Sequence, residues 1–156
     1  MKLKLISTSL IAIALTVGPA ALNADTPGHH PAYLRARSDL RTSQFLMRVR
    51  EEPNVTRNLR EADREVEAAI REIDRAAIID RKDFDDHPRI DASLDRRGRF
   101  EKIVALLRSA RADLAREEDN GRARGWRDAA YRHIDGALDA MHRAARDQHW
   151  DHFFGF

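Results

Sequence analysis

The chain has 156 residues, with 28 lysines and arginines against 26 aspartates and glutamates, and it contains no cysteine. This near balance excludes the excess of positive charge with which proteins attract nucleic acid or an anionic membrane. The lack of cysteine excludes disulfides, thiolate catalysis, cysteine zinc sites and a lipid anchor on a thiol. Packing alone must therefore hold the fold together.

The amino terminus has the pattern of a secretory signal peptide. Two lysines precede an apolar run over residues 5–17, and a stretch of mostly small residues follows, up to Ala24. This run is too short for a membrane-spanning helix, which needs about 20 apolar residues. We therefore expect residues 1–24 to be removed. Residues 25–156 should act in the periplasm or outside the cell, with a formal charge of zero and no transmembrane segment.

Two segments of helical period come first. The first predicted helix spans residues 31–51, because proline suits a first helical turn and Pro53 closes the segment. Its apolar stripe is Tyr33, Ala36, Leu40, Ser43 and Met47. The second spans residues 56–79, with Thr56 as the N-cap. Its stripe is Leu59, Ala62, Val66, Ala69, Ile73 and Ala76, widened by Ile70 and Ala77.

Two more helical segments follow a polar stretch around Pro88. The third predicted helix spans residues 93–118, with Asp91 or Ser93 as its cap. Its stripe is Phe100, Ile103, Leu107, Ala110 and Leu114. The fourth spans residues 125–148, with a stripe of Trp126, Ala130, His133, Ala137, Ala140 and Ala144 and with Ile134 and Met141 beside it. No segment shows the alternation of a strand.

This pattern predicts an all-α fold, an up-down-up-down four-helix bundle over residues 25–156. Each helix has one apolar face, so none is stable alone and the four must share a core. A chain of this length forms one domain.

Three segments also carry a resemblance to a family. They are HPAYLRARSDLR (30–41), EIDRAAIIDRKDFDDHPRID (72–91) and SARADLAREEDNGRARGWRDAAYRHIDGAL (109–138). Through them, nearly the whole mature chain resembles a family of predicted exported bacterial proteins of unknown function. DDHP at 85–88 and EEDN at 117–120 are the most specific parts, while Arg89 stands where the family more usually has a second proline. The resemblance implies a helical domain and supplies no activity, ligand or catalytic residue.

Histidines and aspartates gather at one end of an up-down-up-down bundle. That topology brings together the start of the first helix, the connection after the second and the end of the fourth. The candidate metal ligands are His29, His30, Asp85, Asp86, His87 and Asp91, with His142, His149 and His152 at the same end. Imidazole and carboxylate suit a divalent metal ion such as Zn²⁺, Ni²⁺ or Cu²⁺. No spacing fixes two ligands on one helical turn. The alternative is that the histidines are solvated and that Asp86 and Asp91 serve as turn or cap residues.

A second candidate site lies in the predicted core. His133 and Met47 both occupy stripe positions, and a Met/His pair facing across a bundle ligates b-type haem. The alternative is a core histidine satisfied by a hydrogen bond, because alanine-rich stripes indicate close helix packing.

The carboxyl terminus, WDHFFGF (150–156), holds four of the ten aromatic residues. We expect it to fold back on the bundle, although a docking segment is the alternative. No catalytic motif stands on its own. The sequence therefore favours an exported binding or structural module of the cell envelope, with a protein partner there, over an enzyme. Metal binding and haem binding are the alternatives.

Overall fold

The computed structural model describes residues 31–79, 93–116, 121 and 123–150. Across these ranges the chain forms four helices and no strand, which confirms the all-α prediction. They are α1 (Pro31–Met47), α2 (Pro53–Ile79), α3 (Arg96–Ala115) and α4 (Arg124–Asp147). None of these helices is both long enough and apolar enough to cross a membrane. The predicted signal peptide lies outside the described residues.

The turn between the first two helices is longer than the sequence pattern predicts. Helix α1 ends at Met47, and α2 begins at Pro53, whose missing N–H costs nothing at a first helical position. Thr56 is therefore not the N-cap but lies in the first turn of α2. Its hydroxyl accepts a hydrogen bond from the Glu51 N–H (3.1 Å) and donates one to the Glu51 carbonyl (2.8 Å).

The N-cap of α3 is Asp95, where the sequence suggested Asp91 or Ser93. The Asp95 side chain accepts a hydrogen bond from the backbone N–H of Gly98 at 2.7 Å. This is the usual bond from an N-cap side chain to the third helical residue. Asp91 lies outside the described residues.

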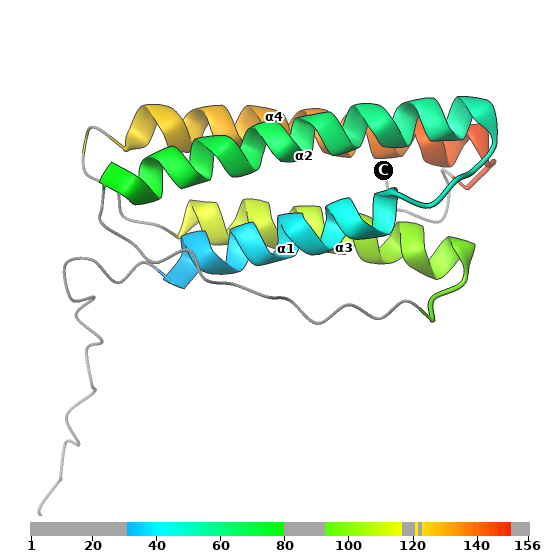
Figure 1. The fold of residues 1–156 in the computed structure, drawn as a ribbon, viewed down its shortest axis with the longest axis horizontal. Helices are drawn as coiled ribbons and strands as arrows, with labels where there is room; N and C mark the ends of the chain where they lie inside the picture. Colours follow the sequence, from blue (N-terminus) through cyan, green and yellow to red (C-terminus); the bar gives the residue numbers. More distant parts are fainter. Residues whose placement is uncertain (1–30, 80–92, 117–120, 122, 151–156) are drawn as a thin grey trace, which may run out of the picture.

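The helices form two layers, α1 with α3 and α2 with α4, which face each other (Figure 1). Neighbours across and within the layers are antiparallel. Arg35, near the start of α1, pairs with Asp113, near the end of α3, at 3.2 Å. Asn58, near the start of α2, donates to Asp147 at the end of α4 at 2.8 Å. The closed order around the bundle is therefore α1, α2, α4, α3.

The predicted up-down-up-down topology is wrong, because it makes α1 and α3 parallel. The observed order is up-down-down-up, in which α2 and α3 run in the same direction (Figure 1). Ile79 and Ser93, the described residues that flank positions 80–92, consequently lie at opposite ends of the bundle. The prediction assumed that a short connection makes each helix antiparallel to the one before it. Fourteen peptide links reach up to about 45 Å, and the 27 residues of α2, which set the distance to be spanned, are about 40 Å long, so the connection permits either arrangement.

The predicted core of the first three helices is confirmed. Every residue of their stripes is buried, Ser43 included. The Ser43 hydroxyl donates to the Leu40 carbonyl at 2.7 Å, which satisfies this polar group without a partner from another helix. In α4 the buried face is centred about one residue further along, on Ile134 and Met141. His133 is therefore not a core residue, because 35% of its side chain is exposed.

Candidate functional site

The six predicted metal ligands, His29, His30, Asp85, Asp86, His87 and Asp91, lie outside the described residues. Two further histidines of that proposed end, His142 and His149, are described. They lie toward the end of α4, which the observed topology places away from the start of α1. The prediction that these two histidines lie at the same end as the start of the first helix is therefore wrong. Within the described ranges, no three His, Asp or Glu side chains are grouped to hold a metal ion.

The surroundings of His142 change the pKa of its side chain. Burial lowers the pKa of its imidazole below the ordinary value of a histidine, and the nearby Arg108, Arg146 and Arg143 act in the same direction. The carboxylate of Asp139 opposes this effect in part. The neutral form is favoured at neutral pH, so His142 adds no positive charge to this end of the bundle.

The structure does not bring Met47 and His133 together. Met47 is buried at the end of α1, the end of the bundle that also holds the end of α4. His133 precedes that end by 14 residues, or about 21 Å of helix. Its Nδ1 lies 2.7 Å from Oε2 of Glu65, and Gly136 provides the space for this carboxylate. Met47 and His133 therefore cannot ligate one haem in this arrangement.

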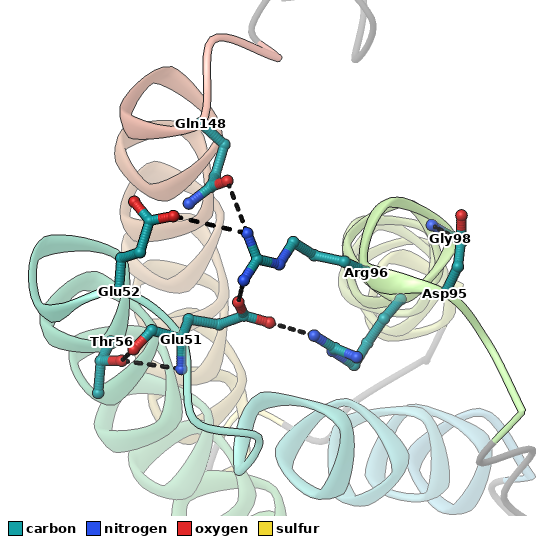
Figure 2. Close-up of polar contacts among 8 residues, drawn as sticks. Glu51, Glu52, Thr56, Asp95, Arg96, Gly98 and Gln148 are labelled. Carbon is teal, nitrogen blue, oxygen red and sulfur yellow. Dashed lines mark hydrogen bonds and ion pairs between the residues drawn. The ribbon is translucent and has the colours of Figure 1, made fainter.

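A polar network fixes the turn between α1 and α2 (Figure 2). Only 2% of the Glu51 side chain is exposed, and its two carboxylate oxygens pair with Arg99 and, at 2.7 Å, with Arg96. Arg96 also donates to Gln148 at 3.3 Å and lies 3.7 Å from the carboxylate of Glu52. One carboxylate thus ties the α1–α2 turn to the start of α3, and Arg96 extends the tie to the end of α4.

The same turn borders a hollow in the surface, which we call the turn hollow. It encloses about 520 Å³, within the range of small-ligand sites, and runs between the end of α1 and the first turns of α2. Met47 and Leu59 form its buried apolar floor. Its polar lining includes Arg48, Arg50, Arg60 and Asp63. A second hollow of about 320 Å³ adjoins it and shares Arg50, Thr56 and Arg60.

The turn hollow gathers three arginines against one acidic residue in its lining. Arg48, Arg50 and Arg60 are exposed, and no described residue forms an ion pair or hydrogen bond with the guanidinium group of any of them. Several other arginines are paired, as Arg37 is with Asp74 at 2.6 Å. The amino terminus of α2 lies beside the hollow and adds partial positive charge. The electrostatic character of the hollow is therefore positive.

Asp63 is the one acidic residue that lines the turn hollow. Its Oδ1 is buried, and no described group donates a hydrogen bond to it. A buried acceptor that lacks a donor is unfavourable by about 1–3 kcal/mol. Thr56 plays no comparable part, because its hydroxyl is engaged twice by the backbone of Glu51.

Sequence reasoning missed this hollow entirely. Its arginines at positions 48, 50 and 60 follow no helical spacing, since a turn separates the first two from the third. Arginine is also by far the commonest basic residue of the chain, so three of them carry no signal of their own. No protein-family model, curated protein or solved structure matches this chain.

Proposed function

We propose that the mature chain is an exported binding module of the cell envelope, and not an enzyme, and that it takes a small amphipathic anion in the turn hollow. The observation that carries this proposal is a set of three arginines, whose guanidinium groups pair with no described residue, around a concave surface with an apolar floor. Guanidinium groups form charge-assisted and often bidentate hydrogen bonds with carboxylates and phosphates.

The apolar floor and the charged rim of the turn hollow would contact different parts of one ligand. Met47 and Leu59 are 4% and 2% exposed, so the floor offers apolar contact at a wall of low dielectric constant. Charge pairs beside such a wall are stronger than in bulk water. The arginines at the rim then hold the anionic group. The hydroxyl of Thr56 is engaged twice by the backbone of Glu51 and is therefore not available as a nucleophile, which supports binding over chemistry.

Arg60→Gln is expected to weaken binding of 4-methylpentanoate, a carboxylate with a branched alkyl tail, by about tenfold. This is the loss expected when one charge-assisted hydrogen bond is removed. Calorimetric titration of the purified protein at constant ionic strength measures it.

The matched control is Arg64→Gln, because Arg64 is an exposed arginine of the same helix that pairs with no described residue and does not line the hollow. It should bind 4-methylpentanoate as the parent does. Equal weakening by both substitutions would mean that net charge, and not the hollow, governs binding. Absence of binding by the parent would remove the proposal.

Export is the second part of the proposal, supported by the charged start and short apolar run of residues 1–24. Expressed in a bacterial host, the full chain should appear outside the cytoplasm, shortened by about 24 residues, as mass spectrometry will show. Ile13→Arg places a charge in the apolar run and should leave an uncut chain in the cytoplasm. An exported protein that keeps Met1 would contradict the signal peptide.

A further inference from the structure

We propose that the ligand of the turn hollow is a free α-amino acid with an aliphatic side chain. This inference rests on the proposed anion site and adds the group that Asp63 recognises. The hollow holds three kinds of lining together: arginines for a negative group, a carboxylate for a positive donor and an apolar floor. A zwitterion with an alkyl side chain presents the complement of all three.

The spacing of the charged groups sets the size of the charged part of the ligand. Arg60 and Asp63 are three residues apart on α2 and both line the hollow, so their Cβ atoms are about 5–6 Å apart. They carry opposite charge and yet form no ion pair with each other. The carboxylate and ammonium of an α-amino acid are attached to one carbon atom. One such ligand therefore meets Arg60 and Asp63 at the same time.

Asp63 also argues against ligands that bring a second negative charge. A phosphate or a dicarboxylate would place a second negative charge beside the partly buried carboxylate of Asp63. The repulsion between these charges would select against such ligands. An ammonium group removes that repulsion and forms an ion pair with the carboxylate of Asp63, which lines the hollow. The aliphatic side chain then packs on the apolar lining, where the exposed Val49 lies with the buried Met47 and Leu59.

The test compares three probes that share one branched alkyl tail. L-Leucine carries both charged groups, 4-methylpentanoate lacks the ammonium, and 3-methylbutylamine lacks the carboxylate. Titrated into the purified protein at pH 7, leucine should bind about tenfold or more tightly than either, because it gains a hydrogen bond between charged groups. Leucine binding no tighter than 4-methylpentanoate would overturn the inference and leave the anion site standing.

Asp63→Asn and Asp63→Ala separate the role of Asp63 from that of the arginines. Both should reduce the preference for leucine over 4-methylpentanoate to about threefold or less, while 4-methylpentanoate binds at least as well as to the parent. Urea unfolding of each variant checks that the bundle is intact. A full leucine preference in either folded variant would overturn the assignment of Asp63. If neither leucine nor 4-methylpentanoate binds the parent, the anion site fails together with this inference.

Discussion

Glu51→Gln is expected to lower the free energy of unfolding by about 3 kcal/mol. The side chain of Glu51 is 2% exposed and that of Arg99 is 13% exposed, so this charge pair is largely removed from water. Glutamine has the shape of glutamate but lacks its charge, and the guanidinium of Arg99 would remain poorly solvated without a counter-ion. Removing one partner of a buried pair typically costs 3–5 kcal/mol. Arg96, which is 44% exposed, loses less because water reaches it.

Urea unfolding measures this loss, and Glu67→Gln is the matched control. Glu67 pairs with Arg71 at 2.8 Å in the same helix, but the two side chains are 60% and 55% exposed. Such surface pairs contribute at most about 0.5 kcal/mol. If both substitutions reduce stability equally, the Glu51 network does not fix the turn.

Spin labels at Glu52→Cys and Arg97→Cys are expected to lie within about 20 Å of each other. The carboxylate of Glu52 is 3.7 Å from Arg96, so the α1–α2 turn and the start of α3 share one end of the bundle. The cysteine-free chain allows each label a single attachment site. Double electron–electron resonance measures the distance directly.

The complementary pair is Ile78→Cys with Arg97→Cys. Ile78 is 64% exposed near the end of α2, a helix that rises by about 38 Å from Pro53 to this residue. We expect about 35–40 Å between these labels. An up-down-up-down bundle would reverse the two results, with a short distance for Ile78 and a long one for Glu52. The topology is therefore decided by which pair is close.

The sequence determined the elements and most of the core. Burial in a helix repeats every 3.6 residues, so a stripe such as Leu59, Val66 and Ile73 identifies its inward face without knowledge of its neighbours. The same reasoning misplaced the face of α4 by about one residue. Alanines at 130, 137 and 144 fit either choice, and only contact with α2 shows that Ile134 is buried while His133 pairs with Glu65.

Tertiary structure alone decided the topology and the candidate site. Periodicity fixes which face of a helix is apolar but not its direction relative to a helix joined by a long connection, so α3 was assigned the wrong direction. Because of that error, His142 and His149 were predicted at the wrong end of the bundle. The turn hollow depends on the meeting of two helices at a turn. Arg48 and Arg60 are 12 positions apart, and only the packing of α1 against α2 places both beside Asp63.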